Sequence, residues 1–438
     1  MEDTQRSQPI STQLQRIANM AESDPELVFT SLVHLIDAEF LKESFHQIRI
    51  GGAAGVDGVS WLEYAGNLDA NVEALHQRLR NGTYRAHAVK RGWIDKDDGK
   101  KRPLGILVIE DKVVQRAAKT LFEAVYEQDF YEFSHGFRPE HSPHQALKEL
   151  RDNCNKINVS TILDADITGF FDNIIRNLLM DVIKKRVNDG GLLRLIGKWL
   201  NAGVLDGEDL FYPEKGTPQG GVISPILANI FLHHVLDEWF VKEIQPLLKG
   251  RSFLIRFADD TVFGFEYESD ARLVMKVLVK RFEKFGLTIH PEKSALIDFR
   301  NPLKRKEESE IAKDTFDFLG FTHYWGKTRR GYYTIKRKTI GKRLRQRMKR
   351  IWKWCKENLH VKITEQYKTL SAKLRGHYQY YGVRCNYKML EAYYEYLLYA
   401  WRHWLTRRTR NGYISYEEFD KILDTFRLPK PRIVHSNI

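Results

Sequence analysis

The chain has 438 residues, more than one ordinary domain holds, so two or three subdomains are expected. Hydrophobic residues make up 42% of it and aromatic residues 12%, which is enough for a buried core and argues against a disordered protein. Lysine and arginine outnumber aspartate and glutamate by 70 to 57, and the net charge of +13 favours a polyanionic partner such as nucleic acid.

The elements predicted along the chain alternate between helices and short strands. Helices are predicted over residues 27–48, 69–82, 113–126, 177–202 and 223–240, and strands in a hairpin over 93–106, at 159–166 and in a second hairpin over 253–265. Beyond residue 339 only helical patterns remain. Helices that alternate with antiparallel hairpins predict an α+β fold.

The cysteines, the N-terminal residues and the longest uncharged stretch indicate the cellular compartment of the protein. The three cysteines lie far apart without a C-x-x-C motif, which argues against a zinc ribbon or a disulfide framework. Residues 1–6 lack the basic-then-apolar order of a signal peptide, and the longest uncharged stretch, 216–236, contains two prolines and is no membrane span. We therefore expect a cytoplasmic protein with no membrane partner.

Positive charge is concentrated in residues 318–356. This segment contains fourteen lysines or arginines and neither aspartate nor glutamate, with aromatic residues such as Trp325 and Trp352 between them. A solvated helix face usually carries both signs of charge, and this one does not. The composition favours contact with a nucleic-acid backbone and its bases.

Three aspartates carry the main signal for chemistry. Asp259 and Asp260 lie at the tip of the 253–265 hairpin, and Asp166 ends the separate strand 159–166. Aspartates are common in turns for purely structural reasons. Here, however, the strands around them are strongly apolar, so the tip belongs to a core sheet. Converging carboxylates are the usual ligands of Mg²⁺, and two such ions, for which Mn²⁺ can substitute, can activate a 3′-hydroxyl and stabilise a leaving pyrophosphate.

Several longer motifs resemble one enzyme family. The sequence FADD at 257–260 looks like the Y/F-x-D-D hairpin tip of reverse transcriptases. Further matches are DITGFFD at 166–172, GTPQGGVISP at 216–225, GFRP at 136–139, HPEK at 290–293 and FDFLGF at 316–321. Taken in chain order, these motifs resemble the group II intron-encoded reverse transcriptase/maturase family, in a form without an endonuclease region.

The resemblance implies a right-hand polymerase with fingers, a palm built on an antiparallel sheet, and an α-helical thumb. On this basis residues 1–82 would form an N-terminal extension and the start of the fingers. Residues 83–315 would form fingers and palm, residues 316–411 the thumb or maturase X region, and residues 412–438 a short tail.

The resemblance also implies which residues hold the metals. By motif these are Asp166, Asp259 and Asp260, with the backbone carbonyl of Ile167 as a further ligand. Asp164 shares a strand face with Asp166 by the two-residue period, but the motif favours Asp166.

For the incoming nucleotide, the family suggests four polar contacts. Lys96 and Arg102 flank a hairpin turn that could close over a triphosphate, although a solvated charged turn is the alternative. Lys293 matches a lysine near the triphosphate and is a candidate general acid to pyrophosphate. Gln219 is expected to touch the nucleotide or the template base.

An aromatic residue is expected beside the sugar. Phe171 lies where the family places a ring that would clash with a 2′-hydroxyl and so select deoxynucleotides. Ordinary core packing is the alternative, and Phe170 is the competing candidate.

Contacts to nucleic acid are expected at two places. Arg138 of the GFRP motif would contact template RNA. Arg343, Arg347 and Arg350 lie at i, i+4 and i+7, so they would share one helix face, and Tyr378 belongs to an aromatic stretch of the thumb.

Together these features predict an RNA-directed DNA polymerase of bacterial group II intron type. Its partners would be template RNA, a DNA primer, deoxynucleoside triphosphates and intron RNA, whose splicing and mobility it would assist. One alternative is a domesticated relative that serves phage defence or CRISPR spacer acquisition. The other is an RNA-binding splicing maturase without polymerase activity, which would not need the three aspartates.

Overall fold

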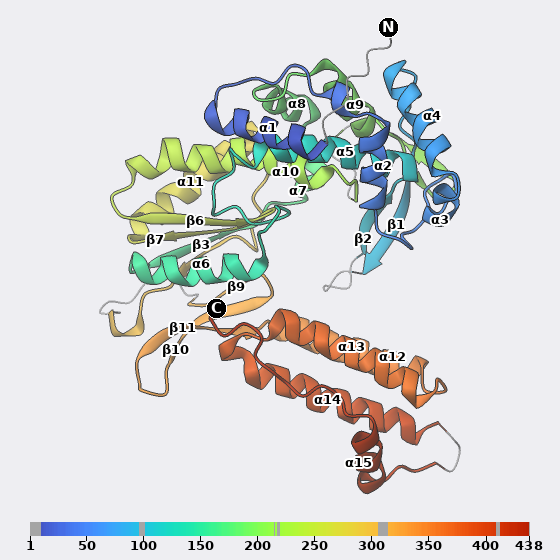
Figure 1. Cartoon of the computed structure of the whole chain (residues 1–438). Helices are drawn as coiled ribbons and strands as arrows, with labels where there is room; N and C mark the ends of the chain where they lie inside the picture. Colours follow the sequence, from blue (N-terminus) through green and yellow to red (C-terminus); the bar gives the residue numbers. More distant parts are fainter. Residues whose placement is uncertain are drawn as a thin grey trace. The chain divides into compact units, whose positions relative to one another are not determined.

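The computed structural model describes residues 10–95, 101–213, 215–216, 220–304, 314–408 and 412–437. The chain divides into two compact units. The first comprises Met1–Ser142, Ala165–Phe263 and Ser269–Ala295, and the second comprises Pro143–Asp164, Gly264–Glu268 and Leu296–Ile438. Figure 1 shows the elements along the chain. No helix among the described residues is long and apolar enough to cross a membrane.

The first unit begins with helices that pack around a buried one. They are α1 (Ile10–Ser23), the short 3₁₀ turn η1 (Val33–Leu35), α2 (Ala38–His46), α3 (Trp61–Ala65), α4 (Leu68–Arg80) and the buried α5 (Ile109–Tyr126). The helix expected over 27–48 is wrong in its first half. Asp37 accepts a hydrogen bond from the Phe40 amide at 2.8 Å, and this cap sets the start of α2 at Ala38.

A four-stranded sheet follows the first helices. Its strands are β1 (Val89–Asp95), β2 (Lys101–Ile106), β4 (Val204–Asp206) and β5 (Asp209–Phe211), in the order β2-β1-β4-β5. β1 and β2 are antiparallel, which confirms the hairpin predicted over 93–106.

The remaining α-helices of this part of the chain each bury an apolar face or side chain. They are α7 (Phe170–Asn173), α8 (Arg176–Lys184), α9 (Gly190–Leu200), α10 (Ser224–Leu232) and α11 (Glu268–Lys284), and this part also contains the 3₁₀ turn η3 (Gln245–Leu247). α10 continues directly into η2 (His233–Ile244), which is a π-helix. π-helical segments are rare and are frequent at functional sites.

A second four-stranded sheet carries the predicted carboxylates at its strand ends. Its strands are β6 (Ser252–Phe257), β7 (Asp260–Phe265), β3 (Thr161–Ala165) and β8 (Ala295–Asp298), in the order β6-β7-β3-β8. The interiors of β3, β6 and β7 are almost entirely buried, as their apolar sequences require. Helices combined with antiparallel pairs confirm the α+β class.

The second unit contains a small antiparallel sheet and a group of long helices. Its elements are α6 (Pro143–Lys156), η4 (Pro302–Lys304), β9 (Phe316–Phe318), β10 (Phe321–Lys327), β11 (Tyr333–Thr339), α12 (Gly341–Glu357), α13 (Ile363–Tyr381), η5 (Arg384–Asn386), α14 (Tyr387–Thr406) and α15 (Tyr416–Thr425). α14 packs against α12 and α13, around the fully buried Trp401, whose indole donates to Gln366 Oε1 at 2.7 Å (Figure 1).

Candidate active site

The tip of the β6–β7 hairpin is a strained two-residue turn. Ala258 and Asp259 connect the strands, and Ala258 has a φ of +57°, in the left-handed region that non-glycine residues seldom adopt. Strained residues persist only where the surrounding structure fixes them, and they cluster at active sites. The turn leaves Asp259 half-buried and Asp260 exposed at the start of β7.

A buried ion pair fixes this turn from behind. The Arg256 guanidinium and the Asp237 carboxylate are fully buried, and Nε and Nη2 of Arg256 make three hydrogen bonds to the two carboxylate oxygens at 2.6–3.1 Å. The same guanidinium donates to the carbonyl of Ala258 at 3.1 Å. Burial favours the neutral acid, but the charge of Arg256 and the hydrogen bonds hold the pKa of Asp237 below its ordinary value. A charged pair therefore ties the strained tip to η2.

The GFRP motif presses its backbone against the same tip. A Cβ atom on Gly136 would lie 2.1 Å from the amide nitrogen of Ala258, so no other residue fits without a backbone shift. Asn229 of α10 donates to the Gly136 carbonyl at 2.7 Å and accepts from Arg256 at 3.0 Å. The motif thus has a structural role that follows from this close approach.

Asp166 is held by the loop that follows α11. The His290 amide donates to the Asp166 carbonyl at 2.8 Å. The buried Ser294 hydroxyl accepts from the Asp166 amide at 3.0 Å and donates to its carbonyl at 3.3 Å. These bonds position the backbone of Asp166 and leave its carboxylate one-third exposed.

Four of the predicted site residues, two acidic and two basic, interact through their charges. Burial raises the pKa of Asp259, and the negative charge of Asp166 raises it further, while the charge of Arg102 acts in the opposite direction. Lys293 Nζ lies 3.2 Å from Asp166 Oδ2, on the exposed side of the site. The charge of Asp166 thus disfavours the charged form of Asp259, and the two carboxylates with Arg102 and Lys293 offer oxygen ligands for a cation and positive charge for a phosphate.

Comparison with known proteins decides the family. The family model described as reverse transcriptase (RNA-dependent DNA polymerase) matches residues 94–323, just over half of the chain. The chain belongs to the reverse transcriptase family. The predicted tip, Asp166 strand and HPEK loop all lie within the matched residues.

Individual relatives place the chain in the group II intron branch of the reverse transcriptases. It is 34% identical to protein YkfC of Escherichia coli, over 56% of this chain and 70% of that protein. It is 34% identical to the group II intron-encoded protein LtrA of Lactococcus lactis, over 53% of this chain and 39% of LtrA. Nuclear intron maturase 4 of Arabidopsis thaliana is 26% identical over 60% of this chain and 34% of its own length. The chain thus spans well under half of the last two relatives. The predicted group II intron reverse transcriptase/maturase family and RNA-directed DNA polymerase class are confirmed.

Two of the predicted nucleotide contacts, Lys96 and Gln219, lie outside the described residues. The glycines around Gln219 show why the reverse transcriptase motif needs them. Gly220 has a φ of +107°, and a Cβ there would lie 2.5 Å from the Gly105 carbonyl of β2. A Cβ on Gly216 would lie 2.8 Å from the Phe171 carbonyl. Both ends of the motif therefore approach neighbouring backbone closely.

The two phenylalanines after Asp166 differ in exposure. Phe170 is 2% exposed and belongs to the core, whereas Phe171 is half-buried and its ring meets Phe170 edge-on, with centroids 5.3 Å apart. Phe171 is thus the ring of the two that a ligand can reach.

The carboxylates fit a divalent metal by the chemistry of their oxygen donors. Among the described residues, no three His, Cys, Asp or Glu side chains already form a compact metal-binding group. The charge of Asp166 nonetheless opposes ionisation of Asp259, and a cation between them would relieve that repulsion. Reverse transcriptases generally use divalent ions, and the hard oxygens here suit Mg²⁺.

Arg138 has a structural role in place of the expected template contact. Its side chain is 4% exposed and donates to Glu127 at 2.8 Å. It also donates to the carbonyls of Tyr131 and Ser134, both at 2.8 Å. With these partners the guanidinium is satisfied inside the first unit.

Tyr378 is likewise unavailable to a ligand. Its ring is fully buried in α13, and its hydroxyl donates to the Pro429 carbonyl at 3.1 Å. Burial raises the pKa of this phenol above its ordinary value. The assignment of Tyr378 to a nucleic-acid surface is therefore wrong for its side chain.

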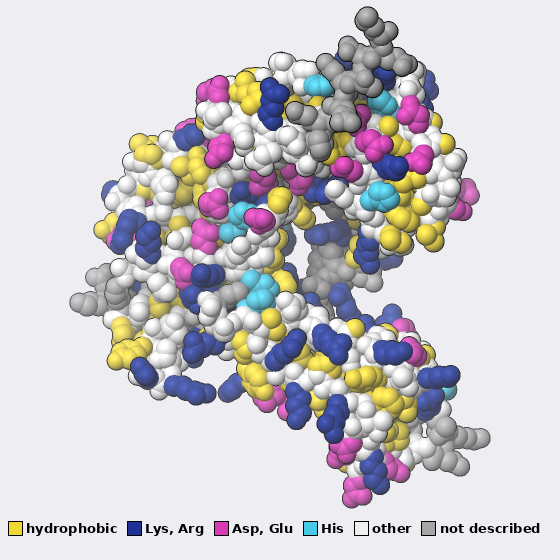
Figure 2. Space-filling model, viewed as in Figure 1, with side chains coloured by type: hydrophobic (Ala, Val, Ile, Leu, Met, Phe, Trp, Pro, Cys, Tyr) yellow, Lys and Arg dark blue, Asp and Glu magenta, His cyan; other side chains and the backbone are white. Residues whose placement is uncertain are grey.

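The three arginines predicted on α12 differ in their surroundings. Arg350 is exposed, and Arg343 and Arg347 are half-buried. The Arg347 guanidinium lies over the Tyr381 ring, 4.8 Å from its centroid. Figure 2 shows many lysine and arginine side chains over the α12–α14 region of this unit.

Sequence reasoning missed the residues that fix the tip. The signal that could have identified these residues is a charge inside an apolar element: Arg256 lies in the apolar strand 252–257, and Asp237 lies in an apolar helix. Buried charges require a partner, so two of opposite sign in neighbouring core elements predict a pair.

Proposed function

We propose that this chain extends a DNA primer on an RNA template, with Asp166, Asp259 and Asp260 as the carboxylates of the reaction centre. The observation that supports the proposal is that Asp166 and Asp259, at strand ends fixed by buried contacts, lie close enough for the charge of Asp166 to raise the pKa of Asp259. Primer extension on poly(rA) annealed to oligo(dT), with purified protein and Mg²⁺, tests it directly.

The chain's own residues would hold and shield the reactants. Two Mg²⁺ or Mn²⁺ ions, held by the three carboxylates and the Ile167 carbonyl, would supply activation of the primer 3′-hydroxyl and neutralisation of the leaving pyrophosphate. Lys293, now paired with Asp166, and the exposed Arg102 would bind the triphosphate oxygens. Lys293 is also placed to donate a proton to pyrophosphate. Lys96 and Gln219 would complete the nucleotide contacts.

The proposal includes the right-hand arrangement of polymerases. Residues 83–315 would form fingers and palm, with the β6-β7-β3-β8 sheet as the palm. Residues 316–411 would form the helical thumb, preceded by an N-terminal extension over 1–82 and followed by a tail over 412–438. The long helices α12, α13 and α14 support the thumb assignment.

Phe171→Ala is expected to raise ribonucleotide incorporation relative to deoxynucleotide incorporation by about tenfold or more. The reason is loss of the accessible ring that would otherwise clash with the 2′-hydroxyl. The measurement is kcat/KM for dTTP and UTP on the same primer and template.

Phe170→Leu is the matched control for this change. Because Phe170 is in the core, it should lower the melting temperature and leave the sugar preference unchanged. An unchanged ratio in a folded Phe171→Ala variant would assign Phe171 to packing.

A second function, assistance to intron RNA splicing and mobility, is supported by the basic segment that forms β10, β11 and most of α12. Fourteen cations without an acid over residues 318–356 suit a long RNA backbone. A role in phage defence or spacer acquisition would use the same site, and a splicing factor without polymerase activity would leave the carboxylates unused.

Neutralising Arg343, Arg347 and Arg350 to glutamine is expected to flatten the dependence of log affinity on log salt by about 2, because each phosphate contact to single-stranded RNA contributes about 0.7. The measurement is anisotropy of labelled RNA over a salt series. Arg347→Gln alone serves as a folding control, since it also loses its contact with Tyr381. Parallel lines for wild type and triple variant would remove this face from the RNA-binding surface.

A further inference from the structure

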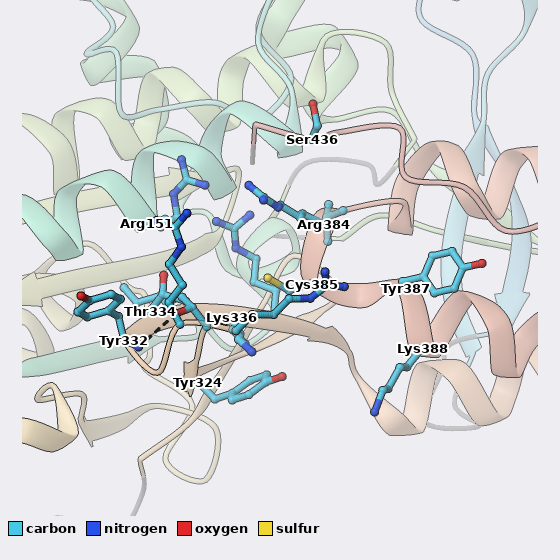
Figure 3. Close-up of a pocket in the computed structure, with 16 residues that line it drawn as sticks. Arg151, Tyr324, Tyr332, Thr334, Lys336, Arg384, Cys385, Tyr387, Lys388 and Ser436 are labelled. Atoms are coloured by element: carbon cyan, nitrogen blue, oxygen red, sulfur yellow. Dashed lines mark hydrogen bonds between the residues drawn. The ribbon is translucent and has the colours of Figure 1, made fainter.

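The second unit contains a wide pocket around the edge strand β11. Its volume is about 1020 Å³, and its walls come from β10, β11, η5, the first residues of α14, Arg151 of α6 and Ser436 near the end of the chain. Figure 3 shows Arg151, Arg384 and Cys385 converging on the strand from different segments. None of these residues belongs to the candidate active site.

The lining of this pocket carries charge of one sign. The cationic side chains are Arg151, Arg329, Arg330, Lys336, Arg337, Arg384 and Lys388, and among the described residues no aspartate or glutamate lines it. Like charges gathered in a concave surface repel one another and concentrate anions there. The pocket therefore selects a ligand with several negative charges.

One of these cations is buried without a hydrogen-bond partner. Arg337 is 3% exposed, and its Nε and Nη1 atoms, both inaccessible to solvent, have no acceptor within the described protein. Its cross-strand neighbour on β10 is His323, which is also buried and whose pKa burial and the Arg337 charge hold far below its ordinary value. A neutral imidazole cannot neutralise the arginine. Buried guanidinium groups almost always have acceptors, so a cation with two unpartnered nitrogens in the lining of this pocket favours an anion there.

The nearest other charges reinforce this preference for an anion. Burial, and then the positive charge of Arg151, lower the pKa of Arg337 to about 10. The negative charge of Asp152 acts in the opposite direction and raises the pKa of Arg337. This carboxylate, however, already accepts two hydrogen bonds from Arg151, at 2.9 and 3.0 Å. A phosphate in the pocket would place negative charge beside both arginines, which line it.

Aromatic side chains of the pocket add a second kind of contact. Tyr332 is 71% exposed and Tyr387 is 44% exposed, and Tyr324 is half-buried beneath the ammonium group of Lys338. Exposed tyrosine rings beside cations suit bases that stack while their backbone is held by charge. The volume is also at the upper limit for a single small ligand, which favours a short stretch of polymer.

We propose that this pocket binds a single-stranded segment of nucleic acid, with one backbone phosphate at Arg337 and flanking bases on the exposed tyrosines. RNA and DNA strands share this chemistry, and the experiment below separates them. The site does not require the polymerase reaction, and its test uses neither nucleotide triphosphates nor a metal ion.

Cys385 provides a direct footprint. It lines the pocket and is exposed, whereas Cys154 and Cys355 are buried. A bound strand should slow alkylation of the Cys385 thiol by N-ethylmaleimide about fivefold or more, measured by mass spectrometry on the full chain. The probes are a 12-nucleotide single-stranded RNA, the DNA of the same sequence, and inorganic phosphate. Protection by either strand supports the proposal and identifies the polymer. Protection by phosphate alone, or by none of the three, overturns it.

Substitutions of exposed residues at the edge of the pocket, here called rim variants, test its positive charge without disturbing the core. Arg384→Ala with Lys388→Ala, both exposed, should weaken binding of the protecting 12-mer and lower its salt slope by about 1.4, for two phosphate contacts. Tyr387→Ala should weaken binding about fivefold or more without changing the slope. The matched control is Lys353→Ala with Lys368→Ala, which removes two exposed charges already paired with Glu357 and Glu365. Equal losses in control and rim variants would overturn the proposal.

Arg337→Met tests the buried group itself. It should abolish protection of Cys385 while the melting temperature stays the same or rises, because an unpaired buried cation is replaced by an apolar side chain. Retained protection in a folded Arg337→Met variant would contradict the role given to Arg337.

Discussion

Asp259→Ala is expected to abolish primer extension, with a loss of about 10³-fold or more, while RNA affinity stays within about twofold of wild type. Under the proposed function this residue would hold a catalytic ion, and such an ion contributes several kcal/mol to the transition state. Asp166→Ala should behave in the same way. The measurements are single-turnover extension of oligo(dT) on poly(rA) and anisotropy binding of the same template.

Asp172→Ala is the matched control for these variants. Asp172 is an exposed aspartate six residues after Asp166, on α7, and its loss should leave extension near normal. Chelation of divalent ions should stop the wild-type reaction, and added Mn²⁺ should restore it. Near-normal extension by a folded Asp259→Ala variant would contradict the assignment of the reaction centre.

The coarse fold followed from local patterns in the sequence. The apolar arms of 253–257 and 261–265, with a three-residue break, predicted the β6–β7 hairpin correctly, because alternation and turn residues are local properties. The α+β class followed from the same patterns. The helix over 27–48 was half wrong because Asp37 caps α2, a competition between side chain and backbone that hydrophobic periodicity does not report.

The site was predictable where a motif fixed the chemistry and less so where partners decided the role. The charge of Asp166 acts on Asp259, and the metal-binding role that the motifs implied for both stays a prediction. Arg138 and Tyr378 were assigned to nucleic-acid surfaces from the motif and the thumb stretch that contain them, but their partners, Glu127 and the Pro429 carbonyl, lie 11 and 51 residues away in the chain. A side chain's burial depends on such distant contacts, which no local pattern contains.

The same reasoning explains why the pocket around β11 was not predicted. The basic run over 318–356 was visible, but its first part forms β10 and β11, not a helix. Arg337 thereby becomes buried between strands, and Arg151 and Arg384 join it from segments outside the run. Composition gave the sign of the charge, and only the tertiary structure shows which cation lacks an acceptor.

Arg256→Met is expected to have the other large effect, on both stability and activity. It leaves the Asp237 carboxylate buried without its counter-charge, which costs about 3–5 kcal/mol of unfolding free energy. It also removes the donor to the Ala258 carbonyl, so the strained tip loses a bond that holds Asp259 in place. Urea denaturation and primer extension on the same preparations measure the two effects.

Three companion variants separate the charge from the geometry. Arg300→Met breaks a two-bond arginine–aspartate pair of the same kind, with Asp298, on a partly exposed side chain, and should cost about 1 kcal/mol or less. Arg256→Lys keeps the positive charge but cannot bond Asp237 and Ala258 together, so it should recover stability more than kcat. The double variant Arg256→Met with Asp237→Leu removes both charges and should restore stability while extension stays slow, because the carbonyl of Ala258 still lacks its donor. If the double variant extends primers at the wild-type rate, the pair serves folding alone and something else holds the Asp259 turn.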